Sequence, residues 1–182
     1  SSLKISPTLK VRHPMKRRHL LSLALLSSTL PLVGCALQKP VYLFERSGRF
    51  SLMTPNEEGK MIAINGRFSL RRTPEVITLD LMTPLNGILA RIEITPSEAT
   101  LTRDLNTPPL FAPSGEELMQ QVLGFALPIP VLEDWLTTKD NQVNAYGWKV
   151  HILKRTVQGM PSTIRAQCSV PSVKLTLSID NE

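Results

Sequence analysis

Apolar and polar residues alternate with a period of two through much of the chain after residue 44, and this pattern constrains the fold more than any other feature. The alternation is found in residues 62–71, 77–81, 88–94, 148–152, 164–168 and 173–180. Successive side chains of a β-strand point to opposite faces, so each run predicts a strand with one dry face and one wet face. Parallel strands are usually apolar on both faces, and the pattern therefore predicts an antiparallel sheet.

One segment between the two groups of runs has a helical pattern instead. Residues 114–117 (Ser-Gly-Glu-Glu) form a capping box, and apolar residues follow it at helical spacing up to Gly124. A second short helix is expected from Pro130 to Trp135, because proline is tolerated in the first turn of a helix. The expected order is five strands, two helices and three or four further strands, which is a mainly β (α+β) fold.

A sheet with one dry face must cover that face, and two short helices can cover only part of it. Strongly twisted antiparallel strands curl, and a curled sheet beneath a helical lid encloses a space. Several residues on the dry face are small, namely Gly66, Ala90, Ala99 and Ala166. They leave either a taper that neighbouring side chains fill or an apolar cavity, and the residue pattern alone favours the filled core.

The N-terminal segment has the features of an export signal with a lipid-attachment site. A basic segment that starts at Met15 precedes an apolar run over residues 20–32, which is too short to span a hydrocarbon core of about 30 Å. The run ends in Leu32-Val33-Gly34-Cys35, which resembles the bacterial lipobox, in which the cysteine is acylated and becomes the N-terminus after cleavage. The alternative is an ordinary signal peptide with an incidental cysteine.

This leader sets the expected domain boundaries. Residues 1–34 are upstream residues and a signal peptide that is removed, residues 35–44 are the acylated cysteine with its linker, and residues 45–182 form a single domain. The residues after the cysteine, Ala36-Leu37, are not the aspartate that typically retains lipoproteins at the inner membrane. By resemblance to bacterial sorting rules, we expect a lipid anchor in the outer membrane, on its periplasmic face.

The net charge of +6 belongs to the leader rather than to the domain. Residues 1–34 hold six lysines and arginines and no acid, which leaves fifteen basic and fifteen acidic residues in the rest of the chain. A domain without net positive charge lacks the basic face of a nucleic-acid-binding protein, which argues against that class. Cys35 and Cys168 are the only cysteines, too few for a disulfide framework or a thiolate zinc site.

Residues that could support catalysis are scarce after the leader. His151 is the single histidine there and falls on the wet face of a predicted strand, while Cys168 falls on a dry face. Acid pairs such as Glu116-Glu117 lie near predicted helix N-termini, where the helix dipole explains them. The sequence therefore predicts that the protein is not an enzyme, with no metal site and no cofactor apart from a covalent lipid on Cys35.

Leu85 has an unusual place, near the tip of the predicted turn in residues 81–87 (Leu-Met-Thr-Pro-Leu-Asn-Gly). Turn tips usually carry polar or small residues, and an exposed leucine forgoes about 1.5–3 kcal/mol of burial. Leu85 therefore either meets something apolar outside the domain or folds back onto the sheet edge. The residues alone leave both options open.

Four segments together resemble the LolB family of outer-membrane lipoproteins. They are Gly48-Arg49-Phe50-Ser51-Leu52, the turn 81–87, Leu123-Gly124-Phe125-Ala126-Leu127-Pro128-Ile129-Pro130 continuing to Leu132 and Trp135-Leu136, and Gly147-Trp148-Lys149-Val150. Their order and spacing extend over about residues 44–180. Two positions depart from the family pattern: Leu70 stands where an aromatic residue is expected, and Thr137-Thr138-Lys139 stands where a Gly-Xaa-Pro segment is expected.

The resemblance implies an incomplete antiparallel β-barrel that encloses an apolar cavity for acyl chains and is lidded by short helices. The cavity is expected from the resemblance alone. The alternation places five apolar residues on the inward face, where they are expected to line it: Ile64, Phe68, Leu79, Ile92 and Trp148. The resemblance also implies that Leu85, in its protruding turn, helps to pass cargo into the membrane.

The implied function is to accept lipoproteins from a LolA-like periplasmic carrier and to insert them into the outer membrane. The implied partners are this carrier, acylated lipoprotein cargo and outer-membrane lipid, and the protein is expected to act as a monomer. Two alternatives remain open. One is a structural or assembly lipoprotein that uses its curved sheet as a protein-docking surface, and the other is a module that carries free lipid.

Overall fold

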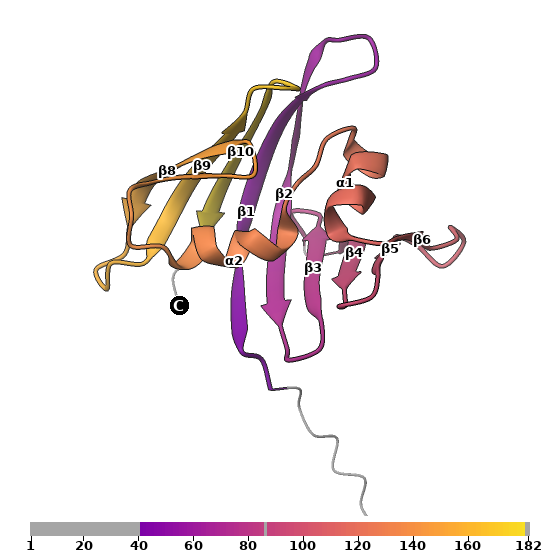
Figure 1. Cartoon of the computed structure of the whole chain (residues 1–182), viewed down its shortest axis with the longest axis horizontal. Helices are drawn as coiled ribbons and strands as arrows, with labels where there is room; N and C mark the ends of the chain where they lie inside the picture. Colours follow the sequence, from indigo (N-terminus) through magenta and orange to yellow (C-terminus); the bar gives the residue numbers. More distant parts are fainter. Residues whose placement is uncertain (1–40, 86, 181–182) are drawn as a thin grey trace, which may run out of the picture. The chain divides into compact units, whose positions relative to one another are not determined.

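The computed structural model describes residues 41–85 and 87–180 of the chain. The described part contains ten strands and two helices (Figure 1). Before the helices lie β1 (Phe44–Pro55), β2 (Met61–Arg72), β3 (Ile77–Met82), β4 (Ile88–Ile94), β5 (Ala99–Thr102) and β6 (Leu110–Ala112). The helices α1 (Gly115–Leu123) and α2 (Ile129–Thr137) are followed by β7 (Gln142–Ala145), β8 (Trp148–Arg155), β9 (Pro161–Cys168) and β10 (Val173–Ile179).

All ten strands form one antiparallel sheet in the order β6-β5-β4-β3-β2-β1-β10-β9-β8-β7. Strand β1 joins the two halves of the sheet, because it pairs with β2 on one side and with β10 on the other. Strands β6 and β7 each pair with one neighbour only, so the sheet does not close. The prediction of a mainly β fold built on an incomplete antiparallel barrel is confirmed.

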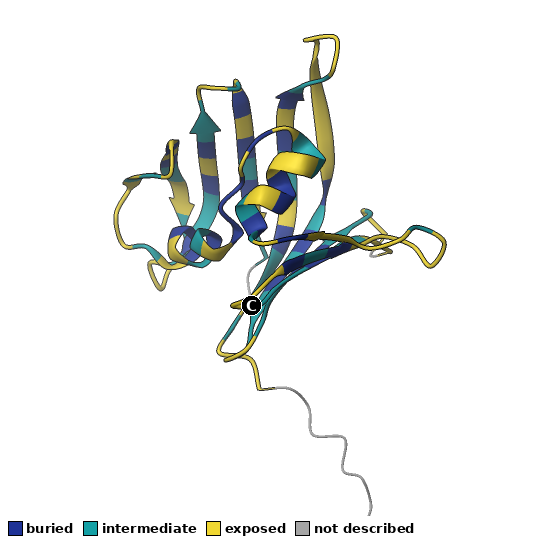
Figure 2. Ribbon diagram, turned by 45° about the vertical axis from the view of Figure 1, so that its right-hand side comes forward, coloured by how far each residue is buried: buried dark blue, intermediate teal, exposed yellow. Residues whose placement is uncertain are grey.

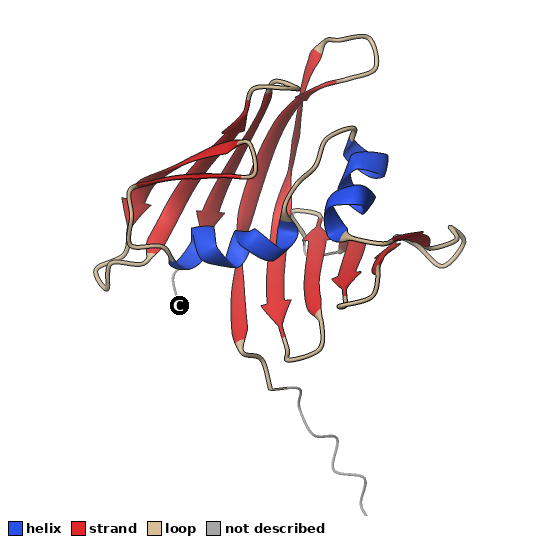
Figure 3. Cartoon of the chain, in the orientation of Figure 1, coloured by secondary structure: helices blue, strands red, loops and turns tan. Residues whose placement is uncertain are grey.

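Both helices lie on one face of the sheet (Figure 3). Ser114 caps α1, because its hydroxyl accepts a hydrogen bond from the Glu117 N–H at 3.2 Å. The helix ends at Gly124, whose φ of 78° lies in the left-handed region that glycine tolerates. The predicted N-cap at Ser114 and the glycine stop are confirmed, and α2 begins one residue before the expected Pro130.

One strand is absent from the sequence prediction. Six strands precede the helices instead of the expected five, and the additional one is β6. A segment of three residues is too short to show a period of two, so alternation could not reveal it. β6 pairs with β5 and forms one edge of the sheet, where α1 packs against both strands.

Buried residues recur at every second position along β10 and the second half of β2, as the period of two predicts (Figure 2). Among the small residues of the dry face, Ala99 and Ala166 are buried and Ala90 is half-buried. Small side chains at these positions let the strands curl around the helices without overfilling the interior.

Gly66 of β2 is a position where only glycine fits. A Cβ atom there would lie 2.7 Å from the Met82 carbonyl oxygen and 2.8 Å from the Phe50 ring. Phe50 is the residue of β1 directly opposite Gly66. The Phe50 ring therefore occupies the space that a side chain at position 66 would need.

Candidate functional site

An apolar cavity of about 120 Å³ lies between the inner face of the sheet and the two helices. All fifteen lining residues are apolar. The sheet contributes Phe50, Leu52, Ile64, Phe68, Leu70, Leu79, Leu81, Ile92, Leu175 and Leu177, and the helices with their connecting loop contribute Met119, Leu123, Leu127, Leu132 and Leu136. Three wider surface hollows of about 420 to 650 Å³ have charged residues in their walls and no helix residue. The apolar space beneath the helices is therefore the candidate ligand site.

Strand register explains why the lining side chains meet. Leu70 of β2 lies opposite Leu79 of β3, and Leu79 lies opposite Ile92 of β4. Each of these three side chains is almost completely buried. Alternation puts each residue on the dry face of its own strand, and antiparallel register then brings the three together as one wall of the cavity.

Four of the five side chains expected to line a cavity do lie around this one. They are Ile64, Phe68, Leu79 and Ile92. Phe68, Leu79 and Ile92 are buried, whereas Ile64 is 41 % exposed. The cavity that the residue pattern alone disfavoured is present.

The structure places the fifth residue, Trp148, elsewhere in the interior. Its ring packs 6.1 Å from the Phe125 ring and 5.9 Å from the Trp135 ring, between centroids. Its Nε1–H donates to the Ala126 carbonyl oxygen at 3.2 Å. Trp148 is fully buried, as alternation predicted, but it holds the segment between α1 and α2 and does not line the cavity.

Sequence reasoning named no cavity residue from the helices, although five come from α1, α2 and their loop. The available signal was helical spacing, because Met119 and Leu123 are four residues apart, as are Leu132 and Leu136. Leu70, the position where an aromatic residue was expected, also lines the cavity. A smaller side chain there leaves more room beneath the helices.

Leu85 is 93 % exposed in the turn between β3 and β4. The turn is held by the Thr83 N–H, which donates to the Gly87 carbonyl oxygen at 2.8 Å, and by the Thr83 hydroxyl, which accepts from the Gly87 N–H at 3.1 Å. The sequence left open whether Leu85 points outward or packs on the sheet edge, and in the structure it points outward. The side chain does not fold back onto the sheet edge.

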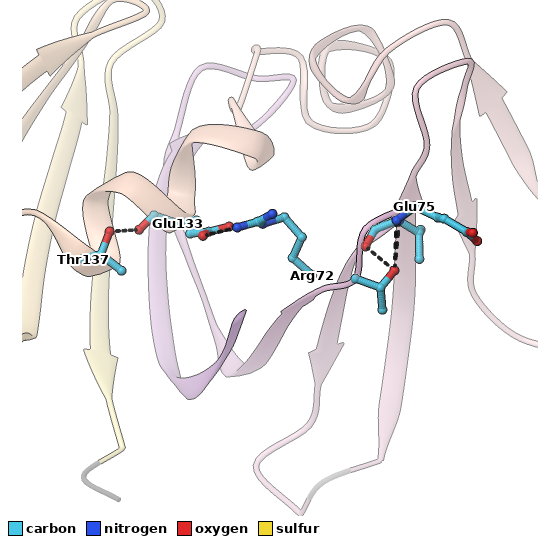
Figure 4. A network of polar contacts seen from close by, with 6 residues as sticks. Arg72, Glu75, Glu133 and Thr137 are labelled. Carbon is cyan, nitrogen blue, oxygen red and sulfur yellow. Dashed lines mark hydrogen bonds and ion pairs between the residues drawn. The ribbon is translucent and has the colours of Figure 1, made fainter. Parts of the chain in front are cut away.

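A two-point ion pair joins the end of β2 to helix α2 (Figure 4). Arg72 Nε lies 2.5 Å from Glu133 Oε2, and Arg72 Nη2 lies 2.8 Å from Glu133 Oε1. The hydrogen bonds to Glu133, together with its charge, raise the pKa of Arg72. Glu133 is adjacent to the cavity residue Leu132 in α2, so this pair fixes the helix that covers the cavity.

Other chemistry is sparse in residues 41–85 and 87–180. No three His, Cys, Asp or Glu side chains in these ranges are grouped as metal ligands would be. His151 is half-buried on the outer face, in register with Gln142 and Arg165. Cys168 is half-buried, with its Sγ 3.5 Å from the Val170 carbonyl oxygen. Cys35 lies outside the described residues.

Helices of the described ranges are also too short to cross a bilayer. Both α1 and α2 have nine residues, and neither has the length and apolar character of a membrane span.

Comparison with known proteins identifies relatives over most of the chain. A family profile described as "Outer membrane lipoprotein LolB" matches residues 43–168. A protein of Cupriavidus metallidurans named "Outer-membrane lipoprotein LolB" is 35 % identical over 161 residues, which cover 83 % of this chain and 75 % of the relative. A protein of the same name from Cupriavidus necator is 36 % identical over 138 residues, which cover 70 % of this chain and 68 % of the relative. A third protein of this name, from Bordetella parapertussis, is 35 % identical over 131 residues, which cover 69 % of this chain and 64 % of the relative.

The profile match includes the strands β1 to β4, both helices and therefore most of the cavity wall. The family resemblance drawn from the four sequence segments is confirmed. The chain belongs to the LolB family of outer-membrane lipoproteins.

Proposed function

We propose that this protein accepts acylated lipoproteins from a LolA-like periplasmic carrier and inserts them into the outer membrane. The observation that carries the proposal is the cavity beneath α1 and α2, whose lining is entirely apolar, in a chain of the LolB family. An acyl chain needs a water-free apolar site and has no polar group that a binding pocket must satisfy.

Transfer of this kind requires a difference in affinity rather than a catalyst. A receptor that binds the acyl chains more tightly than the carrier takes them without an energy source, since each 1.4 kcal/mol of difference is a factor of ten. The bilayer buries the chains completely and is the final acceptor. No covalent bond is made or broken in such a transfer.

The cavity is smaller than a whole acyl chain. A cavity of roughly 150 Å³ lined by Leu, Ile and Phe is known to hold a molecule as small as benzene. The present cavity of about 120 Å³ therefore holds only a short part of an acyl chain. Acceptance of a whole chain requires that α1 and α2 move outward, that part of the chain lies outside the cavity, or both.

The anchor places the receptor where release must occur. We propose that Cys35 carries the lipid, that residues 35–44 link it to the domain, and that the protein acts as a monomer on the periplasmic face of the outer membrane. Because a single acyl chain gives only marginal membrane binding, an anchor of two or three chains is needed for permanent attachment.

The central experiment is transfer from carrier to receptor. A lipoprotein bound to its purified periplasmic carrier is mixed with this protein and with liposomes, and the cargo is located by size-exclusion chromatography and by flotation. We expect cargo to leave the carrier in the presence of this protein and then to appear in the liposomes. Cargo that stays on the carrier when this protein is in excess would overturn the proposal.

A competition experiment separates lipoprotein cargo from free lipid. An environment-sensitive fluorescent fatty acid reports occupancy of the cavity, and acylated and deacylated forms of one lipoprotein compete with it. Displacement by the acylated protein alone supports the receptor. Binding of the fatty acid without displacement by either form supports a free-lipid carrier.

Metabolic labelling tests the anchor separately. Cells that express this protein incorporate a clickable fatty acid into it, and the Cys35→Ala variant should lose the label. Equal labelling of the variant and the natural chain would show that the lipid is attached elsewhere.

A further inference from the structure

The inner face of β2 carries a row of apolar residues that continues beyond the cavity. Leu70 and Phe68 are 2 % and 4 % exposed and line the cavity, whereas Ile64 and Ile62 are 41 % and 38 % exposed. Residues two apart on a strand share a face, so all four side chains point the same way. Exposure therefore rises along one row, from the buried cavity wall to the hairpin between β1 and β2.

Gly66 interrupts this row without opening a polar gap. The Phe50 ring lies where a side chain at position 66 would be, and Phe50 itself lines the cavity. The sequence of apolar surfaces along the row is thus Phe68, the Phe50 ring and Ile64. Opposite Ile62 stands the buried Thr54, whose hydroxyl is directed to the Pro55 carbonyl oxygen.

The end of β2 that carries Ile62 and Ile64 projects beyond its neighbour. Strand β3 ends at Met82, opposite Arg67, so in the sheet Met61–Gly66 pair with β1 alone. Figure 1 shows this hairpin extending above the other strands. Strand β3 therefore does not flank β2 at this end, next to the cavity residue Ile64.

The row is long enough to take an acyl chain. Ile62 and Phe68 are six residues apart, which at about 3.3 Å per residue is roughly 20 Å. One leaflet of a bilayer whose hydrocarbon core is about 30 Å thick holds chains of roughly 15 Å. The cavity is too small for a whole chain, and the row supplies the additional apolar surface.

We propose that Ile62 and Ile64, on the inner face of the β1–β2 hairpin, form an acyl-binding strip that continues the cavity outward. One end of a cargo acyl chain lies under α1 and α2, and the rest lies along Ile64 and Ile62. This inference rests on the proposed receptor function, since it assigns a path to the chain that the receptor accepts. The exposure of two isoleucines in a hairpin is then explained by the ligand that covers them.

Photo-cross-linking tests the path directly. A benzophenone amino acid replaces Ile62 in one form of the full chain and Ala63 in another. Ala63 is the matched control, because it is an exposed neighbour on the same strand with its side chain on the opposite face. Each form receives a lipoprotein with a clickable acyl chain from the carrier before irradiation. We expect cross-links to the acyl chain at position 62 to exceed those at position 63 by about tenfold.

Polar substitution gives a second, independent readout. Ile62→Asn should weaken the binding of a fluorescent fatty acid by about tenfold, because the ligand loses part of an isoleucine contact, whereas Ala63→Asn should not change it. Both sites are exposed, so the two variants should have equal unfolding temperatures. Equal temperatures would show that the substitution changes binding and not folding.

The outcomes distinguish this inference from the receptor function. If the natural chain takes no cargo from the carrier, the receptor function fails and the strip with it. If the natural chain takes cargo while positions 62 and 63 cross-link equally, or Ile62→Asn binds the fatty acid as well as Ala63→Asn does, only the strip is overturned.

Discussion

The indole rings of Trp135 and Trp148 lie 5.9 Å apart between centroids, yet only one of the two N–H groups has a partner among the described residues. Trp148 donates to the Ala126 carbonyl oxygen at 3.2 Å. Trp135 is fully buried, and its Nε1 contacts no acceptor within the same residues. The paired N–H of Trp148 therefore stabilises the fold, whereas the unpaired buried N–H of Trp135 destabilises it.

Replacing each tryptophan with phenylalanine should separate the stability effects of the two N–H groups. Trp135→Phe removes an unpaired buried N–H and some apolar volume, whereas Trp148→Phe removes a hydrogen bond and leaves the Ala126 carbonyl without its donor. We expect Trp148→Phe to destabilise the protein by about 1–3 kcal/mol more than Trp135→Phe. Urea unfolding measures both, and equal losses would show that volume alone decides the difference.

The Arg72–Glu133 ion pair should control how readily α2 leaves the sheet. The Arg72 and Glu133 side chains are 37 % and 24 % exposed, so solvent screens the pair and its loss should change global stability little. Local opening is the more sensitive readout. In Arg72→Gln we expect faster hydrogen exchange at the α2 amides and faster uptake of a fluorescent fatty acid, because the helix covers the cavity.

A charge swap serves as the control for the ion pair. Arg72→Glu combined with Glu133→Arg restores opposite charges and should restore slow exchange in α2. Unchanged exchange in Arg72→Gln would mean that the buried apolar side chains Leu132 and Leu136 hold α2 without help from the pair.

Asp80 should be the most important charged residue for stability. Its side chain is only 5 % exposed and binds Arg91 Nε at 2.7 Å, Arg91 Nη2 at 3.0 Å and Arg71 Nη2. The two arginines belong to β4 and β2, so one carboxylate connects three strands on the outer face. Asp80→Asn should cost about 2–3 kcal/mol, because both arginines lose the carboxylate that binds them. Glu57→Gln, in an exposed turn, is the control and should change the unfolding free energy little.

The sequence was most informative where the physical cause is local. A period of two belongs to each strand by itself, which is why Leu70, Leu79 and Ile92 could each be assigned to a dry face. Helix α1 was predictable for the same reason, since Ser114 and Gly124 act on the residues beside them. Family resemblance supplied the cavity, which the residue pattern alone disfavoured.

Features that depend on distant parts of the chain were not predictable. Arg72 and Glu133 are 61 residues apart, and no spacing rule relates them. Trp148 was correctly placed inside, but whether an interior side chain reaches the cavity depends on where α1 and α2 settle. Ile64 and Ile62 share one pattern with Phe68, and only the early end of β3 shows that they lie in the open.

Leu85 should matter for delivery to the membrane and not for folding or cargo acceptance. It is 93 % exposed, so Leu85→Glu removes almost no native contact and should change stability by less than about 0.5 kcal/mol. A charge at this tip opposes insertion of the turn among lipid chains, where the carboxylate would lose its water. The variant should accept lipoprotein from the carrier at the natural rate and release it into liposomes more slowly.

Val157 provides the matched control for Leu85. It is 98 % exposed, but it lies in the turn between β8 and β9, at the opposite end of the sheet from the turn that holds Leu85. Val157→Glu adds the same charge and should deliver cargo at the natural rate. Liposome flotation over time compares the two variants with the natural chain. Unfolding of Leu85→Glu would show that the residue belongs to the core after all, and equal delivery by both variants would show that the β3–β4 turn does not enter the membrane.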